Sequence, residues 1–110
     1  MPPFTTSTRT HPLLARKNKA ALESASDLMR LLSNPHRLAL LCHLGEGEMA
    51  VGDLAACLGM SPSALSQHLS RLKEAEIVTT RREHNKIYYA LKSKETKDVI
   101  KTLKRLYCAS

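Results

Sequence analysis

The sequence is poor in aromatic residues and has no long apolar run. Its 110 residues include no tryptophan and only one phenylalanine, so the core must be built mainly from aliphatic side chains. No apolar run approaches the roughly 20 residues that a bilayer-spanning helix needs. The first residues, MPPFTTSTRTHP, lack the apolar centre of a secretory signal. We therefore expect a cytoplasmic protein that has no membrane partner.

Cysteine is also scarce. Three cysteines, an odd number, argue against a static disulfide framework in a cytoplasmic chain. Free thiols, a redox pair and metal ligands all stay open as uses for them. The sequence has no Cys-x-x-Cys pair, which disfavours a thiol enzyme such as a sulfur transferase. We expect a protein that is not an enzyme.

Acidic residues are outnumbered by basic ones. The 17 Lys and Arg residues against 10 Asp and Glu give a formal net charge of +7. Such a balance favours an anionic partner, nucleic acid before membrane. Residues 1–17 are rich in Pro, Thr and Ser and contain basic residues but no acid, which predicts a disordered basic arm whose contact with DNA stays open. Residues 18–108 are then one domain for DNA binding and dimerisation.

Residues 51–75 have the pattern of two helices joined by a tight turn. Gly59 follows the first helix, where a left-handed residue commonly ends a helix. Ser61 then caps a second helix through its hydroxyl, and Pro62 occupies the first helical position. The inward positions recur at helical spacing: Leu54, Ala55, Leu58, Leu65, Leu69 and Leu72. The stretch predicts a helix-turn-helix.

The outward side of the second helix is short-chained and polar. Such a helix fits a major groove, because serine and glutamine hydrogen-bond base edges and phosphates without steric bulk. His68 falls at the edge of the buried stripe, so a structural role ranks slightly above DNA contact. The candidate DNA-contacting residues of this helix are Ser63, Ser66, Gln67, His68, Ser70 and Arg71.

Three further helices and a β-hairpin complete the expected order. Helices are predicted at 18–32, 35–44 and 94–107. The side chains of residues 77–91 alternate with the period of a half-buried β-hairpin. A hairpin that follows a helix-turn-helix is called a wing. Basic residues crowd its predicted tip, where they would reach phosphates or the minor groove: Arg81, Arg82, His84 and Lys86.

The first and last helices carry more apolar surface than one small core can cover. A homodimer formed through these two helices would bury that surface. It would also place two recognition helices about one DNA turn, roughly 34 Å, apart. We therefore expect a palindromic double-stranded operator as the DNA partner.

In this order of elements the chain resembles the ArsR/SmtB family of winged-helix repressors. The matching residues are LLSNPHRL at 31–38, DLA at 53–55 with Leu58-Gly59, the recognition helix at 61–72, and the wing. The resemblance implies a mainly α winged helix-turn-helix with a small β-hairpin, in a homodimer. It also implies a transcriptional repressor that an inducer releases from its operator.

Many members of the family sense metals, but the family's metal positions are altered here. The two cysteine positions of one site correspond to Ala50 and Gly52, and residues 94–107 contain no histidine. We therefore predict no metal and no cofactor. Two alternatives stay open: a metal-responsive repressor that uses Cys42, Cys108 and a histidine, and a winged-helix protein-interaction module without DNA binding.

Cys42 and Cys108 resemble the dithiol of the family's persulfide-sensing branch (the BigR and SqrR type). The resemblance implies that reactive sulfur species join the two thiols by a disulfide or polysulfide bridge, which releases the operator and derepresses sulfide-detoxification genes. Nearby cations would lower the thiol pKa: Arg37 and His43 near Cys42, and Lys104 and Arg105 near Cys108. Cys57 shares a face with Leu54 and Leu58, so we expect it to be a small core residue.

Overall fold

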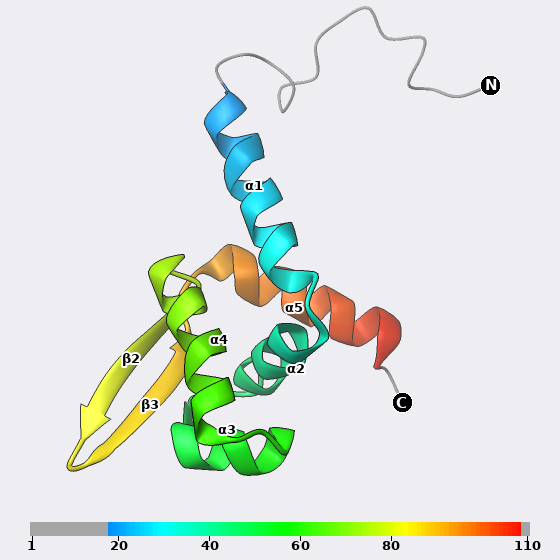
Figure 1. Ribbon diagram of the computed structural model, residues 1–110. Coiled ribbons are helices and arrows are strands. Elements are labelled where there is room, and N and C mark those ends of the chain that lie inside the picture. The colour runs from blue at the N-terminus through cyan, green and yellow to red at the C-terminus, as the bar shows by residue number, and fades with distance from the viewer. Residues whose placement is uncertain (1–17, 109–110) are drawn as a thin grey trace, which may run out of the picture. The chain divides into compact units, whose positions relative to one another are not determined.

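The computed structural model describes residues 18–108, so the predicted basic arm lies outside the described residues. The described part divides between two units, residues 1–30 and 31–110. Its elements, labelled in Figure 1, are α1 (Lys19–Leu32), α2 (Pro35–Leu44), β1 (Met49–Ala50), α3 (Val51–Leu58), α4 (Pro62–Glu74), β2 (Val78–Glu83), β3 (Lys86–Leu91) and α5 (Lys94–Tyr107). Within this part, no helix is long and apolar enough to cross a bilayer.

Most of helix α1 belongs to the first unit. The sequence predicted a helix at 18–32, and α1 begins one residue later and ends at the same residue. Its surface carries an ion pair between Arg30 and Asp27 at 2.7 Å. Leu22 and Met29 of its apolar stripe are 38% and 52% exposed.

Helix α2 begins and ends where the sequence predicted. The Asn34 side chain accepts hydrogen bonds from the backbone N–H groups of His36 and Arg37, which caps the helix start. Pro35 at the first helical position lacks an N–H group that would otherwise need a partner. Leu40, Leu41 and Leu44 are buried in the core, whereas Leu38 and Cys42 of the same helix are only half-buried.

The turn between α3 and α4 has the predicted chemistry. Gly59 adopts a left-handed conformation with φ of 63°, and its N–H group donates to carbonyls of the last turn of α3. Ser61 Oγ accepts from the N–H group of Ala64 and caps α4. The buried residues Leu65, Leu69 and Leu72 hold α4 against the core of the second unit. The helix-turn-helix is therefore confirmed.

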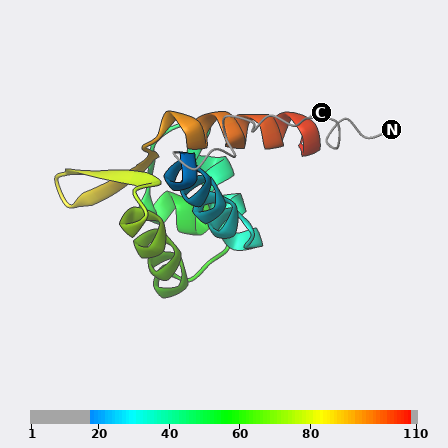
Figure 2. The same ribbon diagram turned by 90° about the horizontal axis from the view of Figure 1, so that it is seen from above.

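The wing is part of a three-stranded antiparallel sheet in the order β1-β3-β2. The sequence predicted only the hairpin and missed β1, which pairs Met49 with Tyr89 and Ala50 with Tyr88. Glu83 pairs with Lys86, so a two-residue turn joins β2 and β3. Figures 1 and 2 show this turn at the end of the hairpin that is remote from α5.

Helix α5 spans the predicted residues and closes the second unit. Ser93 Oγ accepts from the N–H group of Thr96 and caps it, and Ile100 is buried. α5 contacts α2 and β3, and α2 also contacts α3. Leu106 and Tyr107 at its end are 61% and 81% exposed. The order helix, helix-turn-helix, wing, helix defines a mainly α winged-helix fold.

Candidate nucleic-acid interface and thiol site

Helix α4 presents the predicted polar face to solvent. Its apolar stripe is buried, so the residues between the leucines point outward. The exposed candidates are Ser63, Ser66, Gln67, Ser70 and Arg71. Arg71 adds a single positive charge to this otherwise uncharged face. Apart from Arg71, the side chains of this face are short or of medium length, which allows close approach to base edges in a major groove.

His68 lies half-buried at the edge of the stripe, where the sequence placed it. Its ring packs against His36 at the start of α2, with 5.9 Å between the ring centroids and an interplanar angle of 32°. Burial lowers the pKa of His68, and the positive charges of Arg37, His36 and Arg71 lower it further. His68 therefore favours the neutral form and joins α4 to α2.

The two wing arginines lie on opposite faces of the sheet. Arg82 pairs with Ile87, and successive side chains of a strand alternate between faces. Ile87 and Tyr89 line a cavity with Ser66 of α4, so Arg82 shares the face that is turned toward the recognition helix. Arg81 pairs with Tyr88 on the other face. The predicted cluster of four basic residues at one tip is thus divided between two faces.

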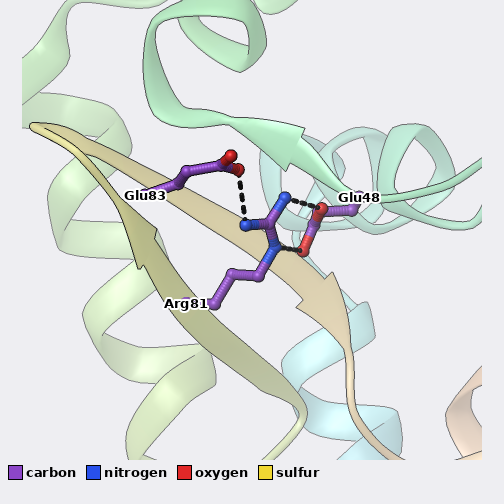
Figure 3. Close-up of polar contacts among 3 residues, drawn as sticks. All are labelled: Glu48, Arg81 and Glu83. Carbon is purple, nitrogen blue, oxygen red and sulfur yellow. Dashed lines mark hydrogen bonds and ion pairs between the residues drawn. The ribbon is translucent and has the colours of Figure 1, made fainter.

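Arg81 is held by two carboxylates, as Figure 3 shows. Its Nε and Nη2 donate to Glu48 at 2.7 and 2.8 Å, and its Nη1 donates to Glu83 at 2.8 Å. The guanidinium also lies 4.5 Å from the centroid of the Tyr88 ring. The hydrogen bond from Arg81 lowers the pKa of Glu48 below its usual value. Arg81 does not lie at the tip but within β2, bound to acids of its own chain.

His84 and Lys86 lie at the tip, as predicted. His84 occupies the turn with φ of 59°, a left-handed conformation that is uncommon for residues other than glycine. Lys86 begins β3 and is exposed. With Arg82, these two residues are the basic groups of the wing that lie at or near its tip.

The two predicted switch cysteines line one cavity. Cys42 is half-buried on α2, and Cys108 is exposed directly after α5. The cavity of about 250 Å³ between these helices is otherwise lined by Leu38, Leu103, Lys104 and Tyr107. Residues separated by 66 positions in the sequence thus reach one small apolar space.

Lys104 is the charged group of this cavity. Its Nζ donates to the Cys42 carbonyl at 3.3 Å and forms an ion pair with Glu46. Burial raises the pKa of Cys42, the nearby Cys108 raises it as well, and Lys104 opposes both. The sequence predicted that nearby cations lower this pKa, but the net shift of Cys42 is upward because desolvation outweighs the effect of Lys104. The Arg37 Nε donates to the Leu31 carbonyl at 2.8 Å.

Cys57 is exposed rather than buried, which corrects the expected core role. Leu54, Leu58 and Ala55 define the inward stripe of α3, and a helical step of about 100° per residue places Cys57 about 100° from its centre. In the part of the chain that the structure describes, no group of three or more His, Cys, Asp or Glu side chains is arranged to hold a metal ion.

Sequence reasoning missed the glutamates that bind these cations. Three exposed acids form ion pairs with Lys104 of the thiol site or with Arg81 of the wing. They are Glu46, Glu48 and Glu83. The available signal was the placement of two acids on either side of Gly47, shortly after the end of α2. Their partners lie 58 and 33 residues away, so the pattern could not identify them.

A winged helix with an exposed polar recognition helix and a basic hairpin defines a DNA-binding protein. The model of the arsR family of bacterial regulatory proteins matches residues 34–80. The transcriptional activator HlyU of Vibrio cholerae is 44% identical over 81 residues, which cover 74% of this chain and 75% of HlyU. The structure of reduced HlyU from this species covers 86% of this chain and 99% of its own, with 39% identity and a TM-score of 0.81.

Two further solved structures carry the same fold. The transcriptional repressor BigR from Xylella fastidiosa is 35% identical, covers 87% of this chain and 99% of its own, and has a TM-score of 0.77. The homodimeric winged helix-turn-helix domain Mb0332 from Mycobacterium bovis is 26% identical, with a TM-score of 0.74. It covers 87% of this chain and 89% of its own. The chain belongs to the ArsR family of transcriptional regulators. It is accordingly a DNA-binding regulator and not an enzyme.

Proposed function

We propose that the chain is a homodimeric repressor that binds a palindromic double-stranded operator. In this proposal residues 18–108 form the binding and dimerisation domain. Helix α4 enters the major groove and contacts it through Ser63, Ser66, Gln67, Ser70 and Arg71, with His68 at the edge of the contact. The wing reaches adjacent phosphates, chiefly through Arg82, His84 and Lys86. Arg81 would contribute only when a phosphate displaces its carboxylate partners.

The dimer contact is proposed to use α1 and α5. Both helices expose apolar side chains, Leu22 and Met29 on α1 and Leu106 and Tyr107 on α5. A second copy would remove these side chains from water. The homodimeric relative Mb0332 supports the assembly of two copies. Two-fold symmetry then places two copies of α4 at successive major grooves.

The proposed inducer is a reactive sulfur species that oxidises Cys42 and Cys108. The single observation that carries this proposal is that both thiols line the same apolar cavity. Few side chains there are polar, so the site favours a small, weakly hydrated oxidant such as a hydropersulfide or an inorganic polysulfide. The similarity to the repressor BigR, and to a HlyU whose solved structure is that of a reduced form, supports this proposal.

The oxidation is a pair of thiol exchange steps. The Cys42 thiolate attacks the sulfane sulfur of RSSH, the new S–S bond forms, the old one breaks, and RS⁻ leaves. The Cys108 thiolate then attacks Cys42 Sγ, which forms the disulfide and releases hydrosulfide. The dithiol loses two electrons, the sulfane sulfur is reduced to sulfide, and both thiol protons pass to the leaving groups. If both cysteines first become persulfides, attack of one on the other gives a trisulfide and hydrosulfide.

A bridge would fix α2 and α5 to each other. α2 contacts α3, the first helix of the helix-turn-helix, so a constraint on α2 reaches the DNA-binding elements. Operator affinity falls if the bridged arrangement fits DNA less well than the reduced one, because the coupling equals the difference in affinity between the two states. Transcription of the repressed genes, which we propose to serve sulfide detoxification, would then rise.

The test is operator binding by fluorescence anisotropy with reduced and polysulfide-treated protein. The operator is taken from the protein's own upstream region. We expect the dissociation constant of the native protein to rise about tenfold or more after sodium polysulfide. Mass spectrometry should locate the bridge at Cys42 and Cys108.

Cys42→Ser and Cys108→Ser should bind the operator when reduced and not respond to polysulfide. Cys57→Ser is the matched control, because it removes an exposed thiol outside the cavity and should respond as the native protein does. A normal response by Cys42→Ser would overturn the dithiol mechanism. Release by zinc alone would favour a metal-responsive repressor instead.

A further inference from the structure

The three-residue segment Glu46–Gly47–Glu48 joins the thiol site to the wing. We call this segment the acidic linker. It follows Gly45, the residue that caps the end of α2, and leads into β1. Its two carboxylates bind different elements: Glu46 pairs with Lys104 of α5, and Glu48 pairs with Arg81 of β2. Gly47 between them has φ of 145°, a conformation that favours glycine and lets the two side chains diverge.

At the thiol end, Lys104 is fixed to both cysteines. Its Nζ donates to the Cys42 carbonyl at 3.3 Å, and its own carbonyl accepts from the Cys108 N–H group at 2.8 Å. Lys104 therefore belongs to the last turn of α5, which carries Cys108. A bridge that moves Cys108 relative to Cys42 must move Lys104 as well. Glu46, bound to Lys104, is the next group to be displaced.

At the wing end, Glu48 orients Arg81. The two parallel hydrogen bonds from Nε and Nη2 fix the guanidinium plane, which a single bond would not. The same guanidinium rests on the Tyr88 ring and binds Glu83, which pairs with Lys86 across the turn. A shift of Glu48 therefore acts on both strands of the hairpin.

We propose that the acidic linker transmits the state of the thiols to the wing. Glu46 and Glu48 are positioning residues in this scheme, and neither contacts DNA or sulfur. The inference rests on the proposed dithiol switch, whose regulation it specifies. Its two ion pairs act in series, so loss of either one interrupts the same connection.

The pairs add little to folding stability, since exposed ion pairs rarely do. Glu48 and Glu83 are substantially exposed, and so is Arg81. Variants that remove a carboxylate should therefore fold normally, and a change in their response reports on coupling. Equal circular dichroism spectra and urea midpoints would establish this for each variant.

The experiment measures the response ratio, which is the operator dissociation constant after polysulfide divided by that of the reduced protein. The variants are Glu46→Gln, Glu48→Gln and the double variant. Glu76→Gln is the matched control, because it removes one negative charge from an exposed ion pair, that with Lys92 at 2.6 Å, outside the linker. All four proteins must form the same Cys42–Cys108 bridge by mass spectrometry.

We expect each single variant to reduce the response ratio to about one third of the native value or less. The double variant should lose no more than the larger single effect, because the two pairs are in series. Glu76→Gln should keep the native ratio. Loss of a negative charge can by itself change the operator affinity of the reduced protein. The control variant will show this effect to a similar extent.

Three results would overturn the inference. A native response ratio in Glu48→Gln or Glu46→Gln, with the native protein responding, removes the linker from the switch and leaves the dithiol mechanism standing. Additive losses in the double variant show two independent routes and contradict the series connection. Absence of any response in the native protein overturns the proposed function, and the inference with it.

Discussion

At the scale of single residues, burial governs the chemistry of Cys42. Desolvation raises its pKa, so at neutral pH the group is mainly a thiol and reacts slowly with general oxidants. Lys104 is the cation that opposes this effect. The apolar surroundings of Cys42 therefore favour the unreactive thiol, whereas Lys104 favours the reactive thiolate.

Replacement of Lys104 by Gln should slow the reaction of Cys42. The lysine lowers the pKa of Cys42, so its loss raises that pKa and reduces the thiolate fraction at a given pH. We expect alkylation of Cys42 by iodoacetamide at pH 7.5 to slow several-fold, with the midpoint of the pH–rate curve moved upward. Site-resolved mass spectrometry measures both, and Lys101→Gln on the same helix is the control. An unchanged midpoint would show that Lys104 does not act on the thiol.

His68 should make folding stability depend on pH. Its pKa in the folded protein is lowered, so the unfolded chain binds the proton more readily. The free energy of unfolding should therefore fall as the pH drops below about 6.5, the ordinary histidine value. Urea unfolding at pH 7.5 and 5.5 measures the loss. His68→Gln should lose less stability over this interval than the native protein, and an equal loss would assign the effect to other groups.

At the scale of elements, the recognition helix depends on its start. Ser61 satisfies the N–H group of Ala64, one of the donors that a helix leaves without an internal partner. Ser61→Ala should cost about 1 kcal/mol of unfolding free energy. Urea denaturation gives this value, and Ser70→Ala is the control because Ser70 lies exposed within the same helix. A cost for Ser61→Ala no greater than that for Ser70→Ala would contradict the capping role.

The wing should reveal its contacts through salt dependence. Each phosphate contact that is lost should reduce the slope of log K against log salt by about 1. Arg82→Ala should flatten the slope by roughly this amount, since Arg82 shares the sheet face that is turned toward α4. Arg81→Ala is the matched comparison, with the same residue type one position earlier on the opposite face. A larger effect at Arg81 would reverse this assignment.

At the scale of the whole molecule, two features require a partner. The chain carries a net charge of +7, which favours DNA. It also exposes apolar side chains on its first and last helices, which a monomer would leave in water. These features act together in a dimer, because two basic domains double the number of phosphate contacts.

A charge at the end of α5 should separate the proposed dimer. Leu106 is 61% exposed, so Leu106→Glu should leave the fold of the second unit intact while opposing burial against another copy. We expect a monomer in analytical ultracentrifugation at micromolar concentration and weaker operator binding. Lys101→Gln changes the net charge by the same amount on the opposite side of α5. A Leu106→Glu dimer of native stability would place the interface elsewhere.

The sequence by itself determined the local structure of this protein. Asn34, Gly59 and Ser61 act within a few residues of themselves, so the bounds of α2 and the turn before α4 followed from capping chemistry and backbone conformation. The periodic spacing of apolar residues identified α5 and the wing, because this spacing is also a local property of the chain. The order of these elements also followed from the sequence, and the family resemblance that rests on this order is confirmed by the comparisons.

Only the tertiary structure decided which side chains meet. β1 has two residues, too few for a periodic pattern, and it exists because β3 pairs with it. How the elements pack decides three further features. These are the ion-pair partners of Glu46 and Glu48, the opposite sheet faces on which Arg81 and Arg82 lie, and the exposure of Cys57. Ion pairs and burial are set by positions in space, whereas a sequence pattern reports only the near neighbours of each residue along the chain.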